Sequence, residues 1–306
     1  LLPSSSFIPL KQIVTEHRTY LPGLGFSLAL GWVFWNARQF RTWVSGLLLV
    51  FISLNFLLTV NRSLDYRSEV LLWEDTAEKS PNKALVHNNL ATAYMGSKML
   101  EEAKQELAIT LRYNPTQPDA YANLGHIHFQ QEKWTQAITE FNHSITLGSL
   151  KPDTYYFSGL SRIKTSAYQE AIPFLQKAVS MRPHSPHYHF DLGEAYRQLR
   201  SFDEALQEFR QVLEIKPRHP QAQNNIGVIF WNLKAYEKAE EAFKKALAIQ
   251  HDLPDIHHNL AALYLKDKRY QKALLHLTQV LKLQPENATA QKLLDHVLSQ
   301  VKRGPQ

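Results

Sequence analysis

The chain has 306 residues, a formal net charge of +6 and no cysteine. Its 44% hydrophobic and 20% charged residues are typical of a folded protein and exclude an intrinsically disordered one. The lack of cysteine excludes disulfide bonds, thiolate catalysis and zinc–thiolate sites.

Half of the net positive charge lies in the first 61 residues, where Lys11, Arg18, Arg38 and Arg41 outnumber Glu16. The rest is spread over the remaining 245 residues. Binding to a phosphate backbone needs a concentrated basic patch. The composition therefore argues against a nucleic-acid partner.

Two uncharged stretches, residues 20–37 and 42–60, are each long enough to cross a membrane as a helix. A turn containing Arg38 and Arg41 separates them, so residues 1–61 predict a membrane segment with a helical hairpin. Both ends of such a hairpin lie on one side of the membrane. The alternative is a hairpin buried in a soluble core, and the second stretch argues against it because it carries no polar stripe.

From residue 84 to residue 287 one pattern recurs every 34 residues, six times and without insertion. Alanine occupies one position of every unit: Ala103, Ala137, Ala171, Ala205, Ala239 and Ala273. A small residue occupies another: Ala91, Gly125, Gly159, Gly193, Gly227 and Ala261. Bulky residues fill two more columns: Leu100, Trp134, Tyr168, Phe202, Tyr236 and Tyr270, and then Leu107, Phe141, Leu175, Phe209, Phe243 and Leu277. This pattern resembles the tetratricopeptide repeat (TPR), a helix-turn-helix unit of 34 residues.

The resemblance implies a right-handed TPR α-solenoid of six repeats with a capping helix. Together with the two transmembrane helices predicted above, which precede it, the expected fold is all-α. Residues 62–83 are expected to form a pre-repeat capping helix, and residues 288–306 a C-terminal capping helix and tail. The expected repeats are 84–117, 118–151, 152–185, 186–219, 220–253 and 254–287.

Two short motifs beside the membrane segment suggest a wider resemblance. Glu16 and Arg18 lie just before the first span and Tyr20-Leu21-Pro22 at its start, and residues 67–76 followed by Ser80-Pro81 come before the repeats. Both are similar to segments of glycosyltransferase-C-type membrane proteins that end in TPRs, including the transmembrane and TPR-containing O-mannosyltransferases and their bacterial relatives. The chain, which lacks an initiator Met, is accordingly expected to be the C-terminal part of a longer protein.

That resemblance implies a polyprenyl-phosphate-sugar donor and an extracytoplasmic repeat array. The catalytic acidic residues of the family lie in a first loop that has no counterpart in this chain, so we predict no catalytic residue and no cofactor here. Glu16 and Arg18 would contact a lipid phosphate in the complete protein or form an interfacial salt bridge. The competing hypothesis is a non-enzymatic, membrane-anchored scaffold that assembles a complex.

In TPR proteins the first helix of each repeat lines a groove for a protein or peptide ligand. Its sixth position holds Asn89, Asn123, Phe157, Asp191, Asn225 and Asn259 in this chain. An amide both donates and accepts hydrogen bonds, so a row of amides can pair with an extended peptide backbone, as in O-GlcNAc transferase, which this row resembles. Common repeat composition is the alternative explanation.

Aromatic side chains at the fifth and twelfth positions extend the predicted groove: Phe129, Tyr156, Phe190 and Trp231. They indicate either a groove for a partly hydrophobic segment, or contact with the membrane domain, or packing between helices. His126 and His128 are two residues apart, as are His187 and His189, and therefore point away from each other on a helix. We predict no metal site.

The third repeat departs from the pattern. It has Ser158 and Arg162 where other repeats have mostly apolar or aromatic residues, and Pro173 inside its second helix. Because fewer apolar atoms would be buried there, we hypothesise that the array bends or opens locally at this repeat.

Overall fold

The structure is a computed structural model that describes residues 50–54, 56–57 and 68–302. The chain divides into two compact units, Leu1–Leu72 and Trp73–Gln306. Most of the predicted membrane hairpin lies outside the described residues, as do Glu16 and Arg18. Residues 50–54 and 56–57, from the second predicted span, are helical. Within the described part of the chain, no helix is both long and apolar enough to cross a membrane.

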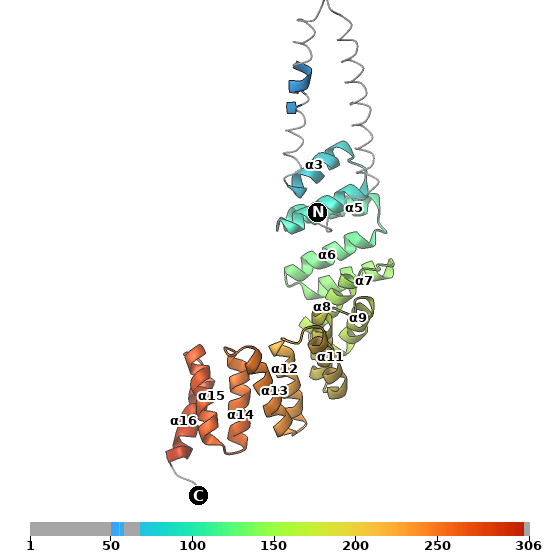
Figure 1. The fold of residues 1–306 in the computed structure, drawn as a ribbon. Helices are drawn as coiled ribbons and strands as arrows, with labels where there is room; N and C mark the ends of the chain where they lie inside the picture. Colours follow the sequence, from blue (N-terminus) through green and yellow to red (C-terminus); the bar gives the residue numbers. More distant parts are fainter. Residues whose placement is uncertain (1–49, 55, 58–67, 303–306) are drawn as a thin grey trace, which may run out of the picture. The chain divides into compact units, whose positions relative to one another are not determined.

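Every regular element among the described residues is an α-helix, which confirms the all-α repeat fold. Helix α3 (Glu69–Lys79) is followed by six antiparallel helix pairs, each repeating the 34-residue unit, and by α16 (Ala288–Lys302) (Figure 1). The pairs are α4 (Ala84–Gly96) with α5 (Leu100–Tyr113), α6 (Pro118–Gln130) with α7 (Trp134–Thr146), α8 (Pro152–Lys164) with α9 (Tyr168–Met181), α10 (Pro186–Gln198) with α11 (Phe202–Ile215), α12 (Pro220–Asn232) with α13 (Tyr236–Ile249), and α14 (Pro254–Lys266) with α15 (Tyr270–Leu283).

Local sequence signals set where the helices begin and turn. Proline occupies the first turn of α6, α8, α10, α12 and α14, where its missing N–H has no partner in the helix anyway. Between the two helices of every pair, one residue adopts a positive φ of 57° to 63°: Lys98, Glu132, Ser166, Arg200, Lys234 and Lys268. The next backbone N–H then bonds back to the helix, as Met99 N does to Tyr94 O at 2.9 Å.

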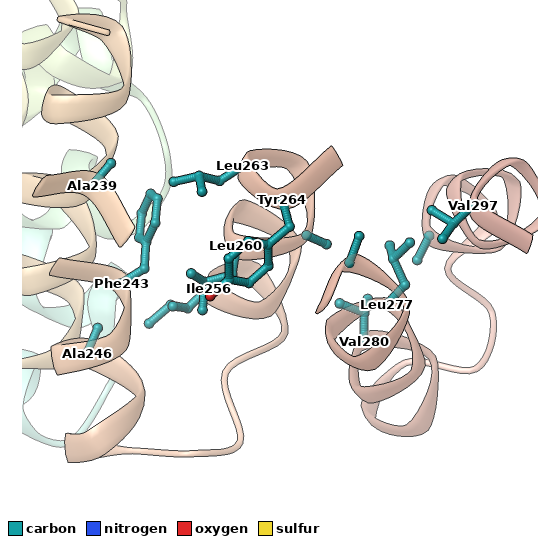
Figure 2. Packing of buried hydrophobic residues seen from close by; sticks show 13 residues of the cluster. Ala239, Phe243, Ala246, Ile256, Leu260, Leu263, Tyr264, Leu277, Val280 and Val297 are labelled. Atoms are coloured by element: carbon teal, nitrogen blue, oxygen red, sulfur yellow. The ribbon is translucent and has the colours of Figure 1, made fainter. Parts of the chain in front are cut away.

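The core is a continuous strip of apolar side chains between successive helices. In the last two repeats Phe243 of α13 lies near Ile256, Leu260 and Leu263 of α14, and Leu277 of α15 continues the strip toward Val297 of α16 (Figure 2). Helix α16 therefore covers apolar surface that the sixth repeat would otherwise expose, as an end cap of a repeat array must.

The third repeat contains a buried polar network beside its apolar core, which includes Leu175. Arg162 is only 6% exposed, and its guanidinium donates to Ser158 O at 3.0 Å, Ser158 Oγ at 2.6 Å and Asn142 Oδ1 at 3.0 Å. It also lies 3.9 Å from the centre of the Phe174 ring. Helix α9 continues through Pro173. The buried guanidinium thus fills the space that an aromatic ring fills in neighbouring repeats, and local opening of this repeat stays a prediction.

Candidate functional site

The candidate site is formed by positions 2, 5, 6, 9 and 12 of the first helices, α4, α6, α8, α10, α12 and α14, which we call the first-helix face. First helices of successive repeats adjoin each other, α4 beside α6 and α6 beside α8, for example. Their equivalent positions therefore form rows along the array, and a side chain in one repeat can reach the next.

Three of the predicted amides connect successive repeats in the same way. Asn123 Nδ2 donates to Asn88 Oδ1 at 3.1 Å and to Thr92 Oγ1 at 3.2 Å in the preceding repeat. Asn259 Nδ2 donates to Asn224 Oδ1 at 3.0 Å, and Asn225 Nδ2 to Glu194 Oε2 at 3.2 Å. Each amide nitrogen is thus turned toward the preceding repeat, and the carbonyl oxygen is the atom left to accept a hydrogen bond from a ligand.

The amide row is interrupted in its middle, at Phe157 and Asp191. Asp191 Oδ2 accepts a hydrogen bond of 2.5 Å from Tyr156 Oη, so these residues join α8 to α10 across one repeat. Burial raises the pKa of Asp191, although the Tyr156 hydroxyl acts in the opposite direction. Burial and the nearby Asp191 also raise the pKa of Tyr156, which stays protonated and serves as a donor.

A second tyrosine–aspartate pair lies beside the first and runs in the opposite direction along the chain. Tyr188 Oη of α10 donates to Asp153 Oδ1 of α8. The Tyr156 and Tyr188 rings are stacked, with their centres 4.4 Å apart. Arg182 forms an ion pair with Asp153, with Nη1 3.3 Å from Oδ1. Sequence reasoning missed Asp153, Tyr188 and Arg182, although the spacing of 35 residues within each tyrosine–aspartate pair is readable in the sequence.

The predicted aromatic residues take part in packing as well as in the face. The ring centres of Phe129 and Trp134 are 5.0 Å apart, and those of Trp231 and Tyr236 are 5.5 Å apart. Each pair connects the two helices of one repeat. Phe190 packs on Phe209 of α11. All three are partly exposed. Phe129, Phe190 and Trp231 therefore give the first-helix face partly exposed aromatic surfaces that packing holds in place.

His126 adds an uncharged imidazole to this surface. Its ring centre is 4.5 Å from that of Phe157 and 5.2 Å from that of Phe141. Burial lowers the pKa of His126 to about 4, so the ring is neutral near pH 7. In the described part of the chain, no three His, Asp or Glu side chains are grouped so that they could hold a metal ion.

Comparisons with known proteins agree with this architecture. A tetratricopeptide repeat family model matches residues 88–152, 158–220 and 190–254, and a second one matches residues 254–287. The crystal structure of YrrB, described as a TPR protein with an unusual peptide-binding site, aligns with a TM-score of 0.58 and 26% identity, over 64% of this chain and 97% of YrrB.

Among curated proteins, the protein O-mannosyl-transferase Tmtc1 of Drosophila melanogaster is 33% identical over 132 residues, which are 40% of this chain and 15% of the fly protein. Tmtc2 of the same species is 31% identical over 115 residues, 36% of this chain and 12% of that protein. The chain thus matches only a small part of these relatives. The family matches together cover more than half of its length, and the chain belongs to the tetratricopeptide repeat family.

Proposed function

We propose that the first-helix face binds an extended polypeptide and presents it to a glycosyltransferase-C-type O-glycosylation enzyme, of which this chain is the C-terminal part. In this proposal residues 20–60 tether the array to the membrane and the repeats lie on its extracytoplasmic side. The relatives named as protein O-mannosyl-transferases support the link to an enzyme. The observation that carries the binding role is the row of oriented amides.

The amide row suits a ligand whose side chains vary. Asn123 uses both of its N–H groups within the chain, which leaves its carbonyl oxygen as an acceptor at a fixed place. Backbone N–H groups of an extended peptide are donors that every residue except proline supplies. Pairing between the two would hold a polypeptide without selecting its sequence, which is what an enzyme with many acceptor sites needs.

The exposed aromatic surfaces add to the affinity for a peptide at places between the amides. Phe129 and Trp231 are held against the second helices, so a ligand that covers them removes apolar area from water without ordering a flexible side chain. We therefore expect the bound segment to combine a free backbone with occasional apolar side chains. YrrB, whose repeats resemble these, is described as having a peptide-binding site.

Removal of the amides tests the proposal. The triple variant Asn123→Ala, Asn225→Ala and Asn259→Ala should weaken binding of a fluorescein-labelled, serine- and threonine-rich peptide of about 15 residues. Each lost hydrogen bond is worth about 1 kcal/mol, so the combined loss should be on the order of a hundredfold in Kd. Fluorescence anisotropy with the 306-residue chain in detergent measures it.

A matched control removes three amides from the second helices. Gln136, Gln207 and Gln271 are exposed on α7, α11 and α15, and their replacement by alanine should leave Kd unchanged. Circular dichroism of both triple variants checks that the repeats remain folded. Equal affinity of the two variants would refute the amide row as the binding element. Peptide binding that has no effect on glycosyl transfer by the protein containing this chain would instead favour the scaffold.

A further inference from the structure

Two aspartates in the middle of the first-helix face each accept a hydrogen bond from a tyrosine, but they differ in their charge partners. Asp153 accepts from Tyr188, and Asp191 accepts from Tyr156. Since the two tyrosine rings are stacked on each other, both carboxylates belong to one cluster that spans the third and fourth repeats.

The charge of Asp153 is balanced within the chain. Arg182 donates through Nη1 to Asp153 Oδ1 at 3.3 Å and through Nη2 to Asp153 Oδ2 at 3.4 Å. The same guanidinium lies 5.6 Å from the centre of the Tyr188 ring. The Asp153 carboxylate thus accepts a hydrogen bond from the Tyr188 hydroxyl and is neutralised by a bidentate contact with the Arg182 guanidinium.

The charge of Asp191 has no such balance. No described residue places a cationic nitrogen within 4.0 Å of the Asp191 carboxylate, which accepts its hydrogen bond from the neutral Tyr156 hydroxyl. Lys164 and His187 act on it only from a longer distance. The other nearby carboxylate, Glu194, already holds Arg197 by an ion pair and accepts from Asn225.

A purely structural role does not account for the charge at this position. Tyr156 needs one acceptor, and the carbonyl oxygen of an uncharged asparagine would serve as well as a carboxylate oxygen. A carboxylate costs more to bury than an amide, and here burial does raise the pKa of Asp191. The buried carboxylate therefore destabilises the fold, and a cation from outside the chain would offset this cost by pairing with it.

We propose that Asp191, positioned by Tyr156, is a subsite for one basic side chain of the extended peptide, an arginine or a lysine, bound as Arg182 is bound by Asp153. This inference rests on the proposed peptide-binding function. Within the amide row, Asn89 and Asn123 lie on one side of the subsite and Asn225 and Asn259 on the other. The amides would thus hold the peptide backbone on both sides of a central basic residue, and Asp191 would select that residue for its positive charge.

The test compares two labelled peptides of about 15 serine, threonine and alanine residues that differ only at the central position, arginine in one and citrulline in the other. Citrulline keeps the shape of arginine without its charge. The full chain in detergent should bind the arginine peptide about tenfold more tightly, as measured by fluorescence anisotropy at low salt. A third arm adds free arginine amide, which should not displace the peptide at equal concentration, since it lacks the backbone contacts.

Two variants decide whether Asp191 is the cause. Asp191→Asn should abolish the preference for arginine and leave the affinity for the citrulline peptide unchanged, because the asparagine still accepts from Tyr156. Asp153→Asn, its neighbour in the same cluster, should keep the preference. Equal affinity of both peptides for the unmodified chain, or a preference that survives in Asp191→Asn, would overturn the subsite and leave the groove intact. Failure of both peptides to bind would overturn the groove and the subsite together.

Discussion

At the scale of single residues, the small-residue column determines how closely the two helices of a repeat approach. A Cβ atom added at Gly227 would lie 2.6 Å from Cδ1 and Cε1 of the Phe243 ring, and one at Gly125 2.7 Å from the Phe141 ring. Both phenylalanines are almost completely buried and have no room to move away. Glycine is required here by contact, and not by backbone conformation.

The first prediction concerns this contact. Gly227→Ala should lower the free energy of unfolding by about 1–3 kcal/mol, because the added methyl group overpacks a rigid core. Urea unfolding followed by circular dichroism measures the change. Gly96→Ala is the matched control, since no atom lies within 4 Å of a Cβ at Gly96, and this variant should be neutral or slightly stabilising.

The chain itself indicates how the defect can be repaired. In the first and sixth repeats the small residue is alanine, Ala91 or Ala261, and the residue that faces it is leucine, Leu107 or Leu277. The double variant Gly227→Ala with Phe243→Leu should therefore recover part of the lost stability. If the two changes were simply additive, the direct contact between these positions would not be the cause.

At the scale of helices, a histidine near the start of the first helix links it to the second. His87 Nε2 donates to Pro81 O at 2.9 Å, and His189 Nε2 to Pro183 O at 2.8 Å. On the other side of each ring, Nδ1 meets a glutamate of the second helix at 2.6 Å, Glu106 or Glu208. The Glu208 hydrogen bond raises the pKa of His189, despite the opposing effect of burial.

The sixth repeat has a histidine in place of that glutamate. His257 Nδ1 lies 2.8 Å from His276 Nδ1, and His257 Nε2 donates to His251 O at 2.9 Å. Two facing Nδ1 atoms can share only one proton. Burial lowers the pKa of His276 to about 4, and repulsion from His257 and Lys244 acts in the same direction. Glu240 opposes this shift without reversing it.

A second prediction follows from the sign of these shifts. His276 is neutral in the fold, so it contributes stability above its unfolded pKa of about 6.5 that is lost as the pH falls toward 4. His276→Glu should reproduce the His189–Glu208 arrangement and reverse the dependence, so that the variant gains stability relative to the parent between pH 7.5 and pH 5. The relative change should be on the order of 1 kcal/mol after screening by solvent.

Urea unfolding midpoints of parent and variant at the two pH values measure this change. The exposed His296 of α16 provides the control, because His296→Gln should leave the pH dependence as it is. Parallel pH profiles for the parent and His276→Glu would show that the histidine pair does not couple α14 to α15.

The sequence predicts these elements better than it predicts their side-chain partners. The 34-residue period and the prolines indicate the helix pairs, because a fixed spacing of small and bulky residues allows one way to pack. The bond from Asn123 to Asn88 and the buried network of Arg162 depend on how one repeat is rotated against the next. That rotation follows from packing along the whole strip, and a single repeat does not encode it.

At the scale of the whole array, stability depends on contacts between neighbouring repeats. A repeat array behaves as a row of units, each stabilised by itself and by its two neighbours. Helices α3 and α16 flank the row, and Glu74 of α3 accepts a hydrogen bond of 2.7 Å from Tyr94 of the first repeat. The third repeat lies in the interior of the row, so a defect there would separate two groups of repeats that remain folded.

The last prediction tests whether Arg162 holds these two groups together. Its guanidinium reaches Asn142 of the second repeat as well as Ser158 of its own, so Arg162→Ala removes contacts within and between repeats and leaves a cavity beside Phe174. We expect a loss of about 2–4 kcal/mol. Hydrogen exchange with mass spectrometry should show reduced protection first in α8 and α9, while α12 to α15 keep theirs.

The matched control is Arg210→Ala, which removes an exposed arginine of α11 and should leave every helix protected. Uniform loss of protection over all repeats in Arg162→Ala would show that the array unfolds as one cooperative unit, against the hypothesis of a local opening. If instead the third repeat of the parent already exchanges faster than its neighbours, the polar network only partly replaces the missing apolar contacts. The Asp191 subsite would then lie beside the most easily opened part of the array, where a bound peptide would also stabilise α8 against α10.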